Sequence, residues 1–154
     1  MQLNPPGALR SVTAVDTAVH PTGTVKSAFL HFVDDLDRPV ELFASLALPH
    51  QVTAQNPVPA VLHLVGGAQT VDARDLLFWT ARGFACVSFD WQIGAFSHHD
   101  PARKSRFPSG VVAQTQPQSQ WHEAVLPIAV RAAGIALDWL ATEPCVDIDR
   151  VGVM

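Results

Sequence analysis

The stretch from residue 60 to residue 90 reads AVLHLVGGAQTVDARDLLFWTARGFACVSFD and has the clearest pattern of strands and helix in the chain. It opens on a nearly continuous apolar run over 60–65, closed by two glycines, which is typical of a strand covered on both faces. Asp72 is a candidate N-cap for a helix over 72–82, and Gly83 is a suitable residue to end that helix. A second buried strand follows over 84–90, so the stretch predicts a strand, a right-handed crossover helix and a parallel strand.

The residues before this stretch have a different period. Apolar or β-branched residues alternate with polar or small ones over 24–33 and again over 40–48, which predicts two half-buried strands. The turn formers over 34–39 are too few for a crossover helix, so the two strands are expected to form an antiparallel hairpin. A further edge strand is expected over about 11–19.

The residues after the stretch predict a loop, a helix and one more strand. Residues 91–120 are rich in Gly, Pro, Ser and Gln without a regular period, and a loop of this length is usually functional or disordered. Residues 121–141 have the apolar spacing of an amphipathic helix, in which Pro127 produces a kink unless it lies in the first turn. A third buried strand opens over 151–154. The expected class is α/β, with a mainly parallel sheet and an antiparallel N-terminal hairpin.

Length and composition restrict the class of protein. The chain has 154 residues, a net charge of -4, 48% hydrophobic and 16% charged residues. This indicates one folded domain and argues against a nucleic-acid partner, because an acidic chain does not attract the phosphate backbone. No apolar segment marks the first ten residues or is long enough to cross a membrane, so we expect a cytoplasmic protein without a membrane partner. Cys86 and Cys145 are too few for a disulfide framework or a zinc site, and reduced thiols are expected.

Four short motifs stand in order between residue 63 and residue 154. They are HLVGGAQT at 63–70, DWQIGAFS at 90–97, ALDWL at 136–140 and VDIDRVGVM at 146–154. Together they resemble the motifs of α/β-hydrolase-fold serine hydrolases of the dienelactone hydrolase and acetylxylan esterase type. The last one is similar to the approach to the G-x-S-x-G nucleophile turn of that family.

This resemblance implies a carboxylic-ester hydrolase with a Ser-His-Asp triad and a small-molecule ester substrate, without a cofactor or a metal. The nucleophile turn would begin after Met154, so residues 1–154 are expected to be a single partial domain, an N-terminal fragment that is inactive alone. The backbone N–H of Gly67 or Ala68 would contribute to the oxyanion hole, and Gln69 and Trp91 would line the substrate pocket. The oligomeric state is left open.

Several alternatives compete with these assignments. The two glycines at 66–67 can simply let a strand turn towards a helix, His63 and Asp90 can be structural, and Trp91 can be a packing residue. His98, His99 and Asp100 with His122 and Glu123 are a weaker candidate for a divalent metal site. The basic residues Arg103, Lys104 and Arg106 can attract an anion or form a solvated face. The alternative function is a non-catalytic, hydrolase-like binding module.

Overall fold

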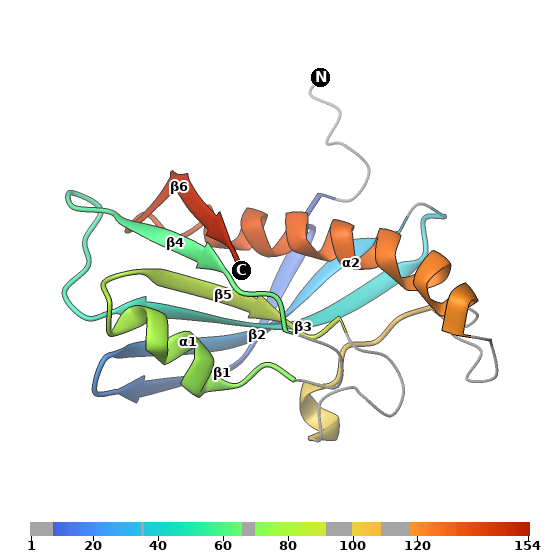
Figure 1. Cartoon of the computed structure of the whole chain (residues 1–154), viewed down its shortest axis with the longest axis horizontal. Coiled ribbons are helices and arrows are strands. Elements are labelled where there is room, and N and C mark those ends of the chain that lie inside the picture. The colour runs from blue at the N-terminus through green and yellow to red at the C-terminus, as the bar shows by residue number, and fades with distance from the viewer. Residues whose placement is uncertain (1–7, 35, 66–69, 92–99, 109–117) are drawn as a thin grey trace.

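The computed structural model describes residues 8–34, 36–65, 70–91, 100–108 and 118–154, with side chains described from residue 127 onward in the last range. Its centre is a six-stranded sheet with the order β1-β2-β3-β5-β4-β6 (Figure 1). The strands are β1 (Ser11–His20), β2 (Gly23–Val33), β3 (Pro39–Pro49), β4 (Val58–Leu62), β5 (Ala85–Phe89) and β6 (Val146–Val153).

The sheet is mixed, which corrects the expectation of a mainly parallel sheet. The expected hairpin is β2–β3, and the expected edge strand is β1, which pairs antiparallel with β2. β3 then pairs antiparallel with β5, and only the joints β5–β4 and β4–β6 are parallel. The β-α-β unit is therefore parallel as expected, but it forms one half of the sheet and the antiparallel strands form the other.

Two helices cover opposite faces of the sheet. α1 (Ala73–Thr80) begins after Asp72, whose carboxylate accepts a hydrogen bond from the Arg74 N–H at 2.8 Å. The chain leaves α1 through Gly83, which has a φ of 82° and a conformation that glycine adopts without strain. α2 (Gln118–Leu140) begins earlier than expected and contains Pro127 inside its span rather than in its first turn.

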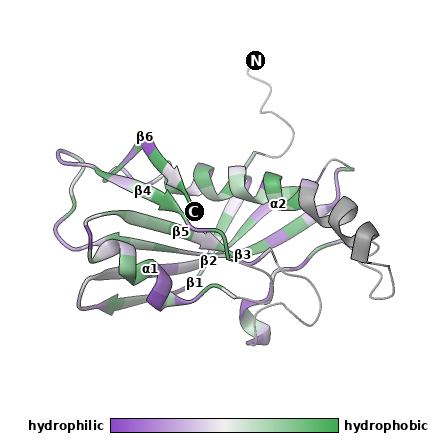
Figure 2. Cartoon of the chain, viewed as in Figure 1, coloured by the Kyte–Doolittle hydropathy of each residue, from purple (hydrophilic) through white to green (hydrophobic). Residues whose placement is uncertain are grey.

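The alternating residues of the strands divide the core into two layers. Leu30 and Leu42 face α2 and pack with Ile135 of that helix in the larger apolar cluster. Phe43 and Val61 face the other way and pack with Leu76 of α1 in the smaller cluster. Figure 2 shows the matching distribution of hydropathy, with apolar segments inside the sheet and polar residues at the outer turns.

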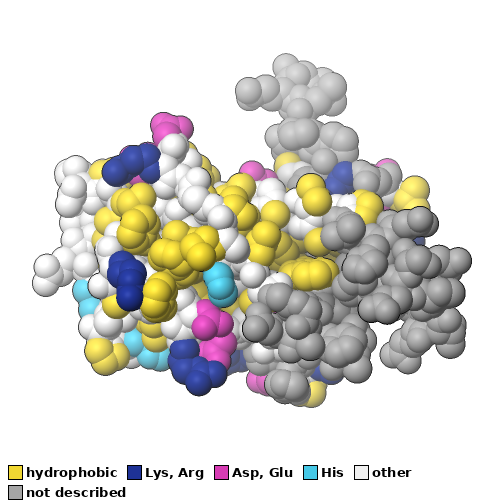
Figure 3. All heavy atoms as spheres, viewed as in Figure 1, with side chains coloured by type: hydrophobic (Ala, Val, Ile, Leu, Met, Phe, Trp, Pro, Cys, Tyr) yellow, Lys and Arg dark blue, Asp and Glu magenta, His cyan; other side chains and the backbone are white. Residues whose placement is uncertain are grey.

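β6 lies at an edge of the sheet and begins at Val146, not at residue 151. Residues 147–150 leave the regular register with β4, and the carboxylate of Asp147 holds them by accepting bonds from the Asp149 N–H and the Arg150 side chain. Beyond this irregularity the side chains of Val153 and Met154 are exposed. Figure 3 shows hydrophobic side chains gathered at the surface over the part of the molecule where Figure 1 places β4 and β6. Among the helices of the described residues, none is long and apolar enough to cross a membrane.

Two glycine substitutions are expected to change stability in opposite directions. A Cβ on Gly23 would lie 2.4 Å from the Leu48 carbonyl oxygen, so Gly23→Ala should lower the free energy of unfolding by about 1–3 kcal/mol. A Cβ on Gly134, inside α2, meets no atom within 4 Å apart from its chain neighbours and the backbone of its own helix, so Gly134→Ala should raise stability by up to about 1 kcal/mol. Urea unfolding of both variants tests the pair, and a loss at residue 134 or a gain at residue 23 would contradict it.

Candidate functional site

The candidate site lies where the carboxyl ends of β4 and β5 meet. The chain after β4 leads to α1 on one face, and the chain after β5 leads eventually to α2 on the other (Figure 1). In open α/β sheets, adjacent strands whose connections leave towards opposite faces form a crevice at their carboxyl ends, and ligands bind there. The order and connections of the strands alone therefore indicate this edge of the sheet as a candidate ligand-binding site.

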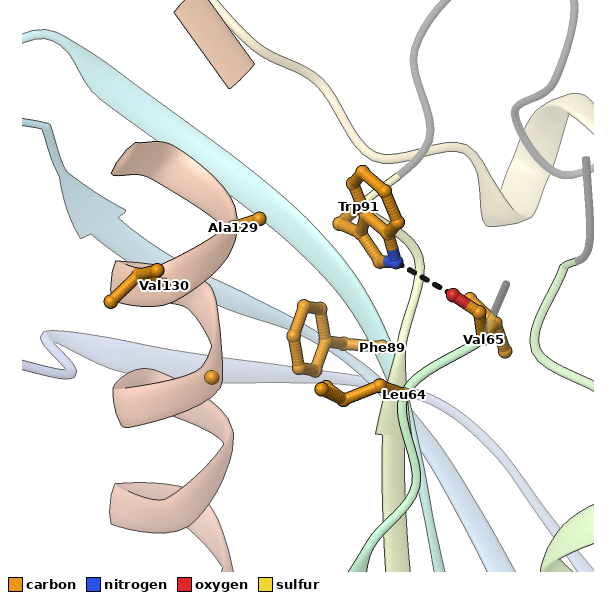
Figure 4. A pocket seen from close by; sticks show the side chains of 7 residues that line it. Leu64, Val65, Phe89, Trp91, Ala129 and Val130 are labelled. Atoms are coloured by element: carbon orange, nitrogen blue, oxygen red, sulfur yellow. Dashed lines mark hydrogen bonds between the residues drawn. The ribbon is translucent and has the colours of Figure 1, made fainter. Parts of the chain in front are cut away.

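An apolar cavity of about 280 Å³ opens at this edge, between the strand ends and the middle of α2 (Figure 4). Its walls come from the end of β4, the end of β5 and one side of the helix. The lining residues are Leu64, Val65, Phe89, Trp91, Ala129, Val130 and Ala133. Such a wall can surround the hydrocarbon part of a small ligand but offers few polar groups to orient it.

Trp91 connects the two strand ends that border the cavity. Its indole Nε1–H donates to the Val65 carbonyl oxygen at 3.0 Å, as the dashed line in Figure 4 shows. The same half-buried ring packs against the larger apolar cluster. The Trp91 side chain thus lines the cavity and also holds the two strand ends together. Lining a pocket and packing in the core are therefore not exclusive roles for this residue. Gly67, Ala68 and Gln69, the other expected site residues, lie outside the described residues.

Sequence reasoning missed the contribution of α2 and of β5 to the cavity. In the sequence, Ala129, Val130 and Ala133 stand within about one helical turn, a spacing that could have indicated a further apolar stripe on the helix. The structure places this stripe at the cavity and leaves Val130 strongly exposed. Phe89 was visible only as a core residue of its strand. No local pattern shows that both groups border one cavity, because their meeting depends on where α2 crosses the sheet.

Asp90 is buried at the end of β5, and its backbone ties the site to a distant segment. Its N–H donates to the Phe43 carbonyl oxygen at 2.8 Å, and its carbonyl oxygen accepts from the Ser105 hydroxyl at 2.5 Å. The same Ser105 oxygen accepts from the Phe43 N–H at 2.8 Å. These bonds fix residues 100–108, which are part of the expected loop 91–120, to β3 and β5. The segment contains the short helix η2 (Pro101–Arg103).

Two of the three basic residues of this segment, Arg103 and Arg106, are paired with acids rather than left to attract an anion. Arg103 forms an ion pair with Asp16 at 2.5 Å and lies 3.6 Å from Asp100. Arg106 forms an ion pair with Glu41. These contacts fasten the segment to β1 and β3, and they favour the structural alternative for Arg103 and Arg106.

The metal alternative receives no support from the part of the chain that the structure describes. Within it, no three His, Cys, Asp or Glu side chains are grouped to hold a metal ion. His98 and His99 lie outside the described residues, as do the side chains of His122 and Glu123. Among the described residues, the buried Nδ1 of His63 has no hydrogen-bond partner, so no bond from this nitrogen to nearby backbone supports the structural alternative for His63.

Both cysteines are free and buried, and neither is an activated nucleophile. Burial raises the pKa of the Cys86 thiol to about 12, and burial also raises the pKa of Cys145. Because the thiolate is the reactive form, both thiols should resist a disulfide reagent at pH 8 and react fully once urea unfolds the chain. A spectrophotometric thiol titration with and without urea measures this, and rapid reaction of Cys86 in the native protein would contradict the burial described here.

Comparison with known proteins shows which solved structures share the fold. No protein-family model matches the sequence, and no curated protein matches it. Among solved structures, acetyl xylan esterase 1 from Thermoanaerobacterium sp. JW/SL YS485 superposes with a TM-score of 0.66 and 18% identity over 94% of this chain and 43% of that protein. Glucuronoyl esterase from Solibacter usitatus gives a TM-score of 0.57 and 22% identity over 99% of this chain and 46% of that protein.

The arrangement of helices and strands matches the N-terminal portion of an α/β-hydrolase fold. A putative acetyl xylan esterase from Bacteroides fragilis NCTC 9343 agrees, with a TM-score of 0.61 and 15% identity over 94% of this chain. The chain spans less than half the length of each of these three structures. At these identities the likeness establishes the arrangement of helices and strands, and the chemistry has to be argued from the site.

Proposed function

We propose that this chain is the N-terminal part of a carboxylic-ester hydrolase whose complete form uses a Ser-His-Asp triad. The observation that carries the proposal is the position of the end of β6. The Leu64 N–H donates to the Met154 carbonyl oxygen at 2.6 Å, and Leu64 lines the apolar cavity. A nucleophile turn that followed Met154 would therefore emerge beside the cavity, at the edge of the sheet where ligands bind in this class of fold.

In this proposal, residues 1–154 supply the elements that bind the substrate, and the nucleophile comes from the rest of the complete protein. Trp91 and Gln69 line the substrate pocket, and the backbone N–H of Gly67 or Ala68 stabilises the oxyanion, an interaction typically worth about 3–4 kcal/mol. The substrate is a small ester, whose acyl or alcohol group the apolar cavity receives. A cytoplasmic location and the absence of nucleic-acid and membrane partners belong to the same proposal.

The experiment is a hydrolysis assay with p-nitrophenyl acetate on two proteins. The 154-residue chain alone should release nitrophenol at the buffer rate, because none of its serines lies in a G-x-S-x-G motif. The product of the gene read beyond the codon for Met154 should be active, and replacing the serine of its G-x-S-x-G by alanine should abolish turnover. A gene that stops after Met154, with a stably folded product that does not hydrolyse esters, would overturn the proposal in favour of a hydrolase-like binding module.

A further inference from the structure

Four polar side chains lie in a row across the α1 face of the sheet. Ser27 of β2 is registered opposite Ser45 of β3, and Ser45 is registered opposite Ser88 of β5. The row continues to His63, which follows β4: its N–H donates to the Val87 carbonyl oxygen at 2.9 Å and extends the parallel ladder by one residue. Strand alternation places all four beside residues of the smaller cluster, such as Ala47 and Cys86.

The two halves of this row differ in how their polar atoms are satisfied. The hydroxyl oxygens of Ser27 and Ser45 are hydrogen-bonded at 3.1 Å. Ser88 is completely buried, and within the part of the chain that the structure describes neither its hydroxyl nor the buried Nδ1 of His63 has a hydrogen-bond partner. Buried polar groups are rarely left in this state, because each unpaired one destabilises the fold.

The two unpaired atoms are chemically complementary and close in the sheet. A serine hydroxyl is a donor, and the Nδ1 of a neutral imidazole is an acceptor when the ring proton sits on Nε2. Neighbouring strands are about 4.8 Å apart, so rotation about the Ser88 Cα–Cβ bond can bring its hydroxyl within reach of a ring on the adjacent strand.

We propose that Ser88 donates a hydrogen bond to His63 Nδ1 and thereby fixes the neutral imidazole with its proton on Nε2. Ser88 is then a positioning residue, and His63 presents an N–H donor at the carboxyl edge of the sheet. The two backbone bonds between Met154 and β4, from the Met154 N–H to the Leu62 carbonyl oxygen and from the Leu64 N–H to the Met154 carbonyl oxygen, bracket His63 in sequence. In the hydrolase proposed above, this donor stands beside the start of the nucleophile turn and serves an oxygen acceptor bound there, a role that rests on the proposed function.

The tautomer of His63 is measurable in the 154-residue chain by long-range ¹H–¹⁵N NMR, with His63→Asn identifying the signals. At a pH where the ring is neutral, the wild type should show a protonated Nε2 and an unprotonated, hydrogen-bonded Nδ1. Ser88→Ala should shift the ring towards a mixture of tautomers, and Ser88→Thr should restore the single tautomer because it keeps the hydroxyl. The matched control is Ser45→Ala, which removes the neighbouring hydroxyl of the same row and should leave the His63 signals unchanged.

The wild-type spectrum alone can overturn the proposal. A proton on Nδ1, or a mixture of tautomers in the wild type, contradicts it even where the Ser88→Ala variant fails to fold. Equal changes in Ser88→Ala and Ser45→Ala would assign the effect to general loosening of the sheet. Since no hydrolysis is measured, a single Nε2–H tautomer in a chain whose longer gene product lacks esterase activity would uphold the Ser88–His63 bond and reject only the proposed function.

Discussion

Replacement of Leu46 by alanine is expected to lower the free energy of unfolding by about 2–5 kcal/mol, the range measured for large aliphatic residues removed from protein cores. Leu46 is fully buried in β3, in the middle of the sheet. It is registered between Lys26 of β2 and Val87 of β5 and belongs to the cluster that packs under α2. Removing its side chain leaves a cavity that strands paired on both sides cannot collapse to fill, so the loss should lie towards the upper end.

The matched control is Leu36→Ala, in the turn between β2 and β3. Leu36 is 69% exposed, so the same chemical change should alter stability by less than about 0.5 kcal/mol. Urea unfolding followed by fluorescence gives both values. Similar losses in the two variants would mean that the sheet does not bury Leu46 in solution as it does here.

Asp34→Asn is expected to cost about 1.5–3 kcal/mol at pH 7, the usual contribution of a hydrogen bond to a charged group. The carboxylate is 5% exposed at the end of β2. It accepts bonds from the Leu36 N–H at 2.9 Å, the Arg38 N–H at 3.0 Å and the Arg38 Nε–H at 2.7 Å. Burial by itself raises the pKa of Asp34, but the hydrogen bonds from Arg38 and Leu36 outweigh it and hold the pKa below its usual 3.8.

The sign of the pH dependence follows from this lowered pKa. The stabilisation is fully present above the ordinary carboxyl pKa of 3.8 and is lost as the pH falls below it, through the lower pKa of the folded state. The stability difference between wild type and Asp34→Asn should therefore be constant from pH 7 to pH 5 and shrink at lower pH. Asp72→Asn, at the more exposed Asp72–Arg74 pair, is the control and should cost less than about 1 kcal/mol. A difference that stays constant down to pH 2 would contradict the assigned role of Asp34.

Sequence periodicity predicted the elements whose signals are local. Residues close together in the chain were enough to predict three features: the hairpin of β2 and β3, the N-cap Asp72 and the helix exit at Gly83. The antiparallel joint of β3 with β5 could not be predicted in this way, because it depends on which strands become neighbours. The early start of β6 was hidden by the polar irregularity at 147–150.

Less of the site than of the fold could be predicted from the sequence, because most contacts of the site join residues that are far apart in the chain. Trp91 follows a buried strand and could be placed at the carboxyl edge from the sequence. The lining from α2, the bond of Ser105 to Asp90 and the ion pairs of Arg103 and Arg106 join segments that are far apart in the chain. They depend on the tertiary arrangement, which no local pattern contains.

The strand order also fixes a sequence of events during synthesis. Once the ribosome has released β3, the antiparallel meander of β1, β2 and β3 has all its internal partners, and local contacts of this kind form quickly. One edge of β3 nevertheless stays open until β5 emerges, because β4, although made first, is not its neighbour. β4 in turn waits for β5 on one side and for β6 on the other. The nascent chain thus carries an unpaired β4 through the translation of α1, and a β4 with one open edge through the translation of α2. A chaperone would find exposed apolar strand backbone to bind during these intervals.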